Sequence, residues 1–329
     1  MSFEYAEAGC TKEELEQFRD EDGFIDLDAL NLSFPLESRE RMGNPDREKN
    51  WISFKGNKAL YKEQVMIDDK DNGMIYAELI VEELAKQAGL EVASTDMVKK
   101  DGKKGILSYS ILKDSEELHS IHSLIGETKD SAEYFDTVDL CDMLKKTIAA
   151  LGKEGLSRED ATDIITDIEK RLAFDMFIMA TDRHTENISL ITDSQGNFKI
   201  SPLYDNENSL MLDMDIELLE DLASSPTSLK TSIDFVDPKV ALIPEDGTLS
   251  KSLWKDTLDA LCSDDDVYDF MMDCFDMLDI NKAIENVETK IKAEIPEVVK
   301  TVAINGFEYR KKEINKVMCM EYDEQSYQI

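Results

Sequence analysis

The sequence predicts an α+β protein in which antiparallel strands and one helix come first and a mostly helical part follows. Two segments of alternating apolar residues flank Gly56-Asn57, a dipeptide typical of tight hairpin turns. Apolar residues then recur at helical spacing over 76–88 and in most long segments of the second half. A chain of 329 residues with 42% hydrophobic content can bury one large core or two lobes. We therefore divide it into an N-terminal lobe, 1–112, and a C-terminal lobe, 113–329.

The predicted hairpin consists of strands over 51–55 and 59–65, and the helix 76–88 follows it. Lys62 lies in the middle of the second strand, and Glu78 lies near the start of the helix. A lysine on such a strand can supply a point charge for phosphate groups, and a glutamate from the next helix can hold that lysine in position. Each residue also has an ordinary structural explanation, as a solvated strand lysine and as an acid near the positive end of a helix.

The C-terminal part is predicted to contain helices on both sides of one short hairpin. The strands of this hairpin are expected over 188–191 and 198–203, with a turn at 194–197. Helical spacing is found in the segments 137–151, 158–180, 253–262, 265–277 and 280–318. We expect the least order in the acidic N-terminal segment, in residues 224–249 and in the tail after Met320.

One polar motif carries the chemistry that the sequence predicts. It is Asp182-Arg183-His184-Thr185-Glu186-Asn187, and Tyr204-Asp205 follows it after the short hairpin. Phosphoryl transfer needs a carboxylate that orients the acceptor hydroxyl, and it needs oxygen ligands for Mg²⁺ near the phosphates. We therefore predict an ATP-dependent phosphotransferase, with Asp182 as the catalytic residue and with Asn187 and Asp205 as metal ligands. Taken alone, the hexapeptide also fits a polar loop at the end of a helix.

The charge of the chain is strongly acidic except in one segment. The chain has 37 basic and 72 acidic residues, a formal net charge of −35. Residues 39–62, the basic island, instead contain more basic than acidic residues: Arg39, Arg41, Arg47, Lys49, Lys55, Lys58 and Lys62 against Glu40, Asp46 and Glu48. The basic island coincides with the predicted phosphate site. It contains no glycine-rich phosphate motif, so we predict phosphate contacts from Arg47, Lys49 and the backbone near Gly43, although a solvated basic hairpin has the same composition.

Four segments of the chain, between about Ser38 and Leu210, resemble the HipA-like Ser/Thr kinases, in particular their short forms. They are Arg47-Glu48-Lys49-Asn50-Trp51 with LYKE at 60–63, AELIVEELAKQAGLEV at 77–92, GILSYSIL at 105–112, and DRHTEN at 182–187 with PLYDN at 202–206. The resemblance implies a bilobal protein-kinase-like fold with a nucleotide-binding N-terminal lobe. It implies Asp182 as the catalytic aspartate, Asn187 and Asp205 as Mg²⁺ ligands, and Lys62 on the nucleotide phosphates. It also places Ile111, Leu112 and Lys113 near the adenine.

The chain departs from this family at several positions. The family often has Asn two positions before the catalytic aspartate and Lys just before the metal-binding asparagine, where this chain has Ala180 and Glu186. The details of acceptor binding therefore stay open. No glycine follows Asp205, so we do not assume a flip of the type known from DFG motifs. HipA itself has an additional N-terminal subdomain, and only about forty residues precede the basic island here, so we do not expect a complex with an antitoxin and DNA.

The nature of the acceptor is predicted from the charge. The pattern DRHxxN also resembles phosphoinositide kinases, in which the histidine is proposed to be catalytic, so His184 is a further candidate and a lipid or small-molecule hydroxyl is an alternative acceptor. An acidic protein is repelled by anionic membranes and by nucleic acid, and we expect neither as a partner. A basic protein with Ser or Thr near Lys or Arg is the acceptor that the charge favours.

The main hypothesis is an ATP- and Mg²⁺-dependent Ser/Thr protein kinase. In this hypothesis Lys62, paired with Glu78, positions the phosphates, and the kinase phosphorylates itself at Ser38 or Ser53. A small-molecule kinase and a nucleotide-binding pseudokinase that acts as an interaction module are the alternatives. The oligomeric state stays open.

The cysteines and histidines predict no further site. The five cysteines form no CxxC pair and no zinc spacing, and their odd number argues against a disulfide framework. His119 and His122 could share a helix face, but no Cys or carboxylate pattern accompanies them. The N-terminus lacks a signal-peptide pattern, and Asp175 interrupts the best apolar run, 172–180. We therefore expect a cytoplasmic protein.

Overall fold

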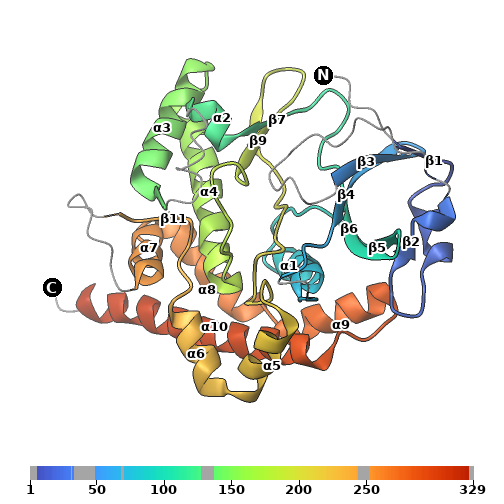
Figure 1. The fold of residues 1–329 in the computed structure, drawn as a ribbon. Helices are drawn as coiled ribbons and strands as arrows, with labels where there is room; N and C mark the ends of the chain where they lie inside the picture. Colours follow the sequence, from blue (N-terminus) through green and yellow to red (C-terminus); the bar gives the residue numbers. More distant parts are fainter. Residues whose placement is uncertain are drawn as a thin grey trace.

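The structure is a computed structural model that describes residues 6–30, 32, 49–67, 70–126, 137–243 and 252–325, with side chains as far as Cys319. A curved sheet lies at one side of the molecule and helices fill the other side, with helix α1 (Met74–Gln87) between them (Figure 1). The predicted α+β class, with strands and one helix in the N-terminal lobe and a mostly helical C-terminal lobe, is confirmed. Ser38, Gly43 and Arg47 lie outside the described residues.

The large sheet has six strands in the order β1-β3-β4-β6-β5-β2. They are β1 (Ala6–Ala8), β2 (Ile25–Asp26), β3 (Lys49–Phe54), β4 (Asn57–Glu63), β5 (Thr95–Lys100) and β6 (Lys103–Tyr109). The four central strands are antiparallel, as predicted, but the edge strands β1 and β2 pair in parallel with β3 and β5. The β3–β4 turn contains Lys55 and Gly56, one residue earlier than predicted, and Gly56 has the positive φ of 100° that favours glycine in tight turns.

The two faces of this sheet contribute to different apolar cores. Neighbouring residues of a strand point to opposite faces. Met97 and Ile106 pack with α1 and the C-terminal helices in the large core, whereas Val98 and Leu107 pack in a smaller core. The smaller core also contains Tyr61 and other side chains of the β3–β4 hairpin. Helix α1 therefore packs with the C-terminal helices as well as with the sheet.

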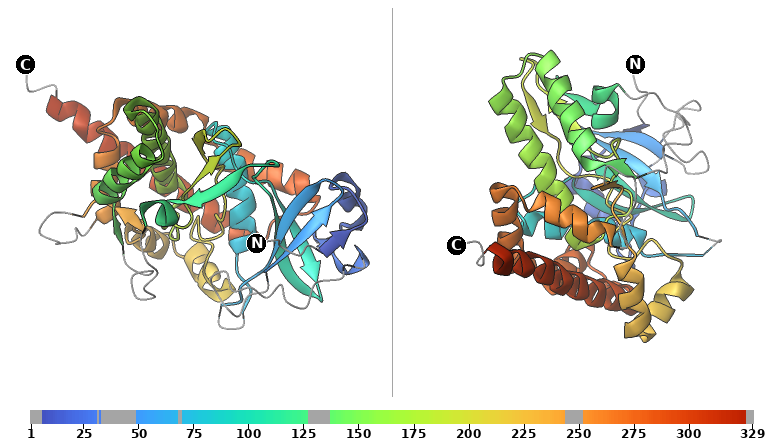
Figure 2. Two further views of the ribbon diagram at one scale, coloured as in Figure 1. Left: turned by 90° about the horizontal axis from the view of Figure 1, so that it is seen from above. Right: turned by 90° about the vertical axis from the view of Figure 1, so that its left-hand side faces the viewer.

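The C-terminal part is built around the long helix α4 (Arg158–Ile178), against which α3, α7, α8 and α10 pack. Its other helices are α2 (Ile121–Ile125), α3 (Leu140–Lys153), α5 (Ile216–Ser224), α6 (Pro226–Asp234), α7 (Leu253–Leu261), α8 (Asp265–Met277), α9 (Ile280–Ile291) and α10 (Glu297–Gln325). The right-hand view of Figure 2 shows the green helices α3 and α4 upright and the dark red helix α10 running across below them.

Two small sheets and two short 3₁₀ helices complete the described elements. The strands β7 (Glu117–Ser120), β9 (Ser189–Thr192) and β10 (Phe198–Ile200) form an antiparallel sheet in the order β10-β9-β7, so the predicted short hairpin is present. The strands β8 (Val138–Asp139) and β11 (Val240–Ala241) pair in parallel. The 3₁₀ helices η1 (Glu13–Phe18) and η2 (Asp28–Leu30) flank β2.

The structure corrects two predictions for the C-terminal part. The single helix expected over 280–318 is two helices, because α9 ends at Lys292 in the left-handed conformation and Pro296 precedes α10. Proline disfavours helical geometry in the residue before it, so α9 cannot continue smoothly into α10. The segment 224–249, expected to have little order, contains α6, which begins with Pro226 after the capping side chain of Ser225.

His119, His122 and the cysteines lie apart from one another in the described part of the chain. His119 lies in β7 and His122 in α2, so they do not share a helix face. All five cysteines are free thiols. Among the described residues, no group of three or more His, Cys, Asp and Glu side chains could hold a metal ion. No described helix is long and apolar enough to cross a membrane.

Candidate active site

The predicted catalytic loop begins where α4 ends. Met179 has the left-handed conformation at the end of α4, and the amide of Ala180 donates to the carbonyl of Asp175. Within the loop, the amide of His184 donates to the carbonyl of Asp182 at 3.0 Å, and the amide of Asn187 donates to the carbonyl of His184 at 2.9 Å. These turns leave the side chain of Asp182 40% exposed and that of His184 10% exposed. The loop therefore presents a carboxylate at the surface and holds the imidazole behind it.

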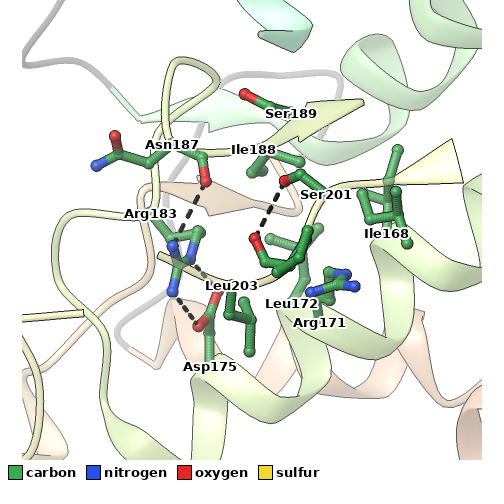
Figure 3. Close-up of a pocket in the computed structure, with 12 residues that line it drawn as sticks. Ile168, Arg171, Leu172, Asp175, Arg183, Asn187, Ile188, Ser189, Ser201 and Leu203 are labelled. Carbon is green, nitrogen blue, oxygen red and sulfur yellow. Dashed lines mark hydrogen bonds and ion pairs between the residues drawn. The ribbon is translucent and has the colours of Figure 1, made fainter. Parts of the chain in front are cut away.

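Arg183 connects this loop to two other segments. Its side chain is 4% exposed and forms an ion pair with Asp175 of α4, with 2.9 Å between Nε and Oδ2 (Figure 3). Nη1 donates to the carbonyl of Tyr204 at 2.9 Å, and Nη2 donates to Oδ1 of Asn206 at 2.6 Å. Nη1 also donates to the carbonyl of Asn187 at 3.4 Å. One guanidinium thus fixes the position of the loop relative to α4 and to the segment that carries Asp205.

The predicted metal ligands lie on two segments that Arg183 joins, since its guanidinium donates to the carbonyls of both Asn187 and Tyr204. Nδ2 of Asn187 donates to the carbonyl of Asp182 at 2.9 Å, which fixes the amide and leaves its oxygen as the atom for a cation. Asp205 has a positive φ of 57°, an uncommon conformation that concentrates at functional sites. Nζ of Lys62 lies 2.5 Å from Oδ1 of Asp205. The structure therefore brings Lys62 of β4 directly to the predicted metal site.

The side-chain oxygens of Asp205 and Asn187 suit Mg²⁺ better than a metal ion that takes all its ligands from the protein. Mg²⁺ in nucleotide sites is bound by one or two protein oxygens together with substrate phosphates and water. Asp205 supplies one carboxylate and Asn187 one amide oxygen. The described residues offer no larger cluster of metal-binding side chains. The oxygen atoms of Asp205 and Asn187 are therefore compatible with the predicted Mg²⁺ site, in which phosphates and water would supply the other ligands.

Glu78 is buried at the inner side of this arrangement. It is 1% exposed, and its Oε2 accepts a hydrogen bond of 2.5 Å from the amide of Asn206, next to Asp205. Burial raises the pKa of Glu78 to about 7; Lys62 opposes this shift, and Asp205 and Glu207 add to it. Glu78 therefore lies in the electrostatic field of the predicted phosphate lysine. Its carboxylate binds the backbone amide of Asn206, the residue after Asp205.

The pKa values of Asp182 and His184 are shifted in ways that suit proton transfer. Burial and the charge of Asp205 raise the pKa of Asp182 to about 6. Burial lowers the pKa of His184, although Glu186 and Asp205 oppose this shift. His184 is therefore neutral at neutral pH. Its Nε2 lies 3.7 Å from Oδ1 of Asp182, and its Nδ1 accepts a hydrogen bond from the amide of Glu186 at 3.2 Å.

The remaining predicted site residues lie around this centre. Lys49 of β3 is the Cα partner of Lys62 on β4, so both side chains point to the same face of the sheet. Ile111 and Leu112 follow β6, and the amide of Leu112 donates to Oγ of Ser110 at 3.3 Å. They lie in the segment between the two lobes. Arg47 lies outside the described residues.

Three residues that were not predicted from the sequence contribute to this site. Asp175 was visible only as an acid that interrupts an apolar run, and such an acid inside a buried helix face signals a buried ion pair. Asn206 has no signal beyond its place after Asp205. Lys239, just before β11, acts electrostatically on both Asp182 and His184. No spacing rule connects Lys239 with residues so far away in the sequence.

A small cavity lies behind the loop, lined by Arg171, Asp175, Arg183 and Asn187 among others (Figure 3). Its volume of about 10 Å³ has room for roughly one water molecule. Nε of Arg171 is buried there without a hydrogen-bond partner among the described residues, so the lining is polar enough to hold a water. The cavity therefore lies among the residues that hold the loop in place, and it is far too small for a nucleotide.

Comparison with known proteins identifies the family. The model of the HipA-like C-terminal domain matches residues 39–237, which include every residue of the proposed centre except Lys239. The chain belongs to this family. The predicted resemblance is thereby confirmed. No curated protein matches the HipA-like chain significantly.

Two solved structures resemble this HipA-like chain in fold. One is the Helicobacter pylori proinflammatory kinase CtkA, with a TM-score of 0.67 and 16% sequence identity, over 90% of this chain and 97% of that chain. The other is a chain of the Shewanella oneidensis MR-1 complex of HipA, HipB and operator DNA, with a TM-score of 0.52 and 13% identity, over 87% of this chain and 69% of that chain. The bilobal kinase-like fold predicted from the sequence is therefore confirmed.

The ion pair between Arg183 and Asp175 predicts a large loss of stability on substitution. Arg183→Met leaves the carboxylate of Asp175 buried without its guanidinium, and we expect the free energy of unfolding to fall by about 3–5 kcal/mol. Urea unfolding measures this change. The matched control is Lys146→Met, whose partner Asp142 is solvent-exposed and lies at 2.7 Å. We expect that control to change stability by less than about 1 kcal/mol. Equal losses in both variants would contradict the role given to Arg183.

Proposed function

We propose that this HipA-like protein is an ATP- and Mg²⁺-dependent kinase that phosphorylates Ser or Thr hydroxyls of proteins. The observation that carries the proposal is that Lys62, Glu78, Asp182, Asn187 and Asp205 meet at one place although they come from separate segments of the chain. The family assignment supports a kinase. The nature of the acceptor is the finer part of the proposal and rests on charge and on the environment of Asp182.

The nucleotide side of the site is explained by Lys62 and Asp205. Asp205 and Asn187 would hold Mg²⁺, which supplies positive charge to the phosphates when it is bound. Lys62, already at 2.5 Å from Asp205, contributes a further positive charge from β4. Glu78 holds the backbone amide of Asn206 and so fixes the orientation of Asp205. Lys49, on the same face of the sheet as Lys62, adds positive charge toward the phosphates.

The acceptor side is explained by Asp182 with His184 and Lys239. Ionised Asp182 would accept a hydrogen bond from the acceptor hydroxyl and take its proton, while the hydroxyl oxygen bonds to the γ-phosphorus of ATP and the bond from that phosphorus to ADP breaks. Neutral His184 lies beside this carboxylate and supports its orientation. Lys239 acts on both groups. The family often has a lysine just before the metal-binding asparagine, where this loop has Glu186. We propose that Lys239 provides the positive charge on the acceptor side instead.

A basic protein is the acceptor that the charges favour. The net charge of −35 attracts Lys- and Arg-rich segments and repels anionic membranes and nucleic acid. Autophosphorylation is part of the proposal, with Ser38 as the favoured position. Ser53 lies in β3, between β1 and β4, so its phosphorylation requires that β3 leave the sheet.

The proposal predicts a phosphoryl mass gain that depends on Asp182. The protein is incubated with ATP, Mg²⁺ and a basic peptide that contains Ser or Thr, and the intact mass of the peptide is measured. We expect phosphorylated peptide with the wild type and none with Asp182→Asn. Inositol and small alcohols, offered in parallel, test the small-molecule alternative. Phosphorylation of the alcohols alone would replace the protein acceptor. Thermal stabilisation by ATP and Mg²⁺ without any transfer would instead indicate a pseudokinase.

The raised pKa of Asp182 predicts that its charge opposes folding. The pKa is about 6 in the folded protein and 3.8 ordinarily, so the folded state binds this proton more tightly than the unfolded state. The penalty on the folded state therefore builds up as the pH rises from about 3.8 to about 6, and it is fully present above about 6. We expect Asp182→Asn to raise the melting temperature at pH 7.5 and to lose this advantage as the pH falls toward 4. A variant that is no more stable than the wild type at pH 7.5 would contradict the partly buried, negatively charged environment of Asp182.

Lys239 provides a test of the acceptor side. We expect Lys239→Met to lower kcat by about 10- to 100-fold, in the range for loss of one electrostatic group near developing charge, while the ATP-induced rise in melting temperature stays unchanged. Lys239→Arg should restore part of the rate. Lys230→Met is the control, because Nζ of Lys230 lies over the ring of Tyr309 at 5.6 Å on the exposed side of α6. A wild-type rate in Lys239→Met would remove Lys239 from the mechanism.

A further inference from the structure

Helix α1 carries two buried carboxylates one helical turn apart. Glu78 and Glu82 are each 1% exposed. Residues four positions apart lie on the same side of a helix. Glu78 binds the amide of Asn206 in the candidate active site. Glu82 instead accepts hydrogen bonds from the amide and the hydroxyl of Thr95, at 3.0 and 2.8 Å, and contacts Lys290 of α9. Any displacement of α1 at Glu82 therefore moves Glu78 as well.

Lys290 is the residue that joins Glu82 to the C-terminal part. Its Nζ lies 3.0 Å from Oε2 and 3.3 Å from Oε1 of Glu82, and it donates to the carbonyl of Thr95 at 2.6 Å. Burial alone would raise the pKa of Glu82, but Lys290 and Lys86 outweigh burial and the pKa is lowered. Glu82 is therefore ionised at neutral pH, and Lys290 is the first of the charges that make this possible.

Further contacts continue along the same seam between α1 and α9. The amide side chain of Gln87 exchanges two hydrogen bonds with the backbone of Asp279, at 2.7 and 3.1 Å. Asn286 donates to Oε2 of Glu83 at 3.0 Å. The apolar side chains of both helices belong to the same large core, and the two helices lie next to each other in the ribbon (Figure 1). The seam therefore combines directional polar contacts with apolar packing.

We propose that Lys290 is a positioning residue for the active site, acting through Glu82 and α1 on Glu78. The seam between α1 and α9 holds Glu78 against Asn206, and hence Asp205 in its orientation, before any nucleotide binds. In this arrangement α1 does not swing away from the C-terminal part as a means of switching the enzyme off. The kinetic consequence rests on the proposed kinase function, whereas the structural consequence does not.

Hydrogen exchange of the Asn206 amide tests this inference without any activity measurement. The amide is protected in the wild type because it donates to Glu78. We expect Lys290→Met to speed its exchange by about tenfold or more, and Lys290→Arg to restore most of the protection. Lys300→Met is the matched control. Its side chain is 20% exposed against 26% for Lys290, and its partners are Glu288 of α9, at 3.2 Å, and Glu297 of α10, at 3.3 Å, rather than a residue of α1. We expect the control to leave the Asn206 amide protected.

A second variant covers the case in which Lys290→Met unfolds. The double variant Glu82→Gln, Lys290→Met removes both charges of this pair, so no ionised carboxylate stays buried at position 82 without its lysine. The positioning role predicts faster exchange at Asn206 in this double variant too. Wild-type exchange at Asn206 in a folded Lys290→Met or double variant would overturn the proposal, because the lysine would then serve stability alone.

Kinetics separate this inference from the proposed function. If the wild type transfers phosphate, we expect Lys290→Met to lower kcat about tenfold with little change in the KM for the acceptor, equivalent to about 1.4 kcal/mol in the barrier. A change in melting temperature with kcat intact would count against the positioning role. If the wild type transfers no phosphate, the kinase proposal fails while the exchange rates still decide whether Lys290 positions Glu78.

Discussion

The buried ion pair between Arg183 and Asp175 is the interaction on which the candidate site depends. Removing two charges from water is so costly that such a pair adds little net stability compared with apolar packing. Its contribution is geometric, because a planar guanidinium donates in several fixed directions at once. Those donors reach α4, the carbonyl of Tyr204 and the side chain of Asn206. A lysine at position 183 would keep the charge and lose this arrangement.

The site brings four carboxylates together, although repulsion between like charges makes such a cluster unfavourable for folding. Glu78, Asp182, Asp205 and Glu207 act on one another, and burial raises the pKa of Glu78 to about 7 and of Asp182 to about 6. Clusters of this kind are typical of functional sites, since stability by itself selects against them. Lys62 offsets part of the charge from the sheet. A divalent cation would offset more, which is a physical reason why this arrangement suits a metal–nucleotide complex.

The sequence predicted elements whose signal is local and missed those whose cause is tertiary. The β3–β4 hairpin, α1 and α4 follow from periodicity and turn residues, and the positions of Lys62, Asp182 and Asp205 follow from spacing and family resemblance. The break between α9 and α10 was signalled by Pro296, but the apolar spacing on both sides concealed it. The parallel edge strands are two and three residues long, too short for a periodic pattern.

The contributors that the sequence could not identify are those whose partners are distant in the chain. Asn206 matters because Glu78, far upstream, accepts its amide hydrogen. Lys239, which lies just before β11, matters because its charge acts on Asp182, 57 positions earlier in the chain. Helix α1 as a whole also packs against partners that are distant in the chain. Its side chains belong to the core of the C-terminal helices, whereas Tyr61 and Phe54 of the hairpin belong to the smaller core. The sheet joins the two cores, because Met97 and Ile106 of its strands pack with α1 in the larger one. The boundary at residue 112 stays a prediction, but α1, which carries Glu78, packs in the same core as α4, whose end leads into the loop of Asp182 and Asn187.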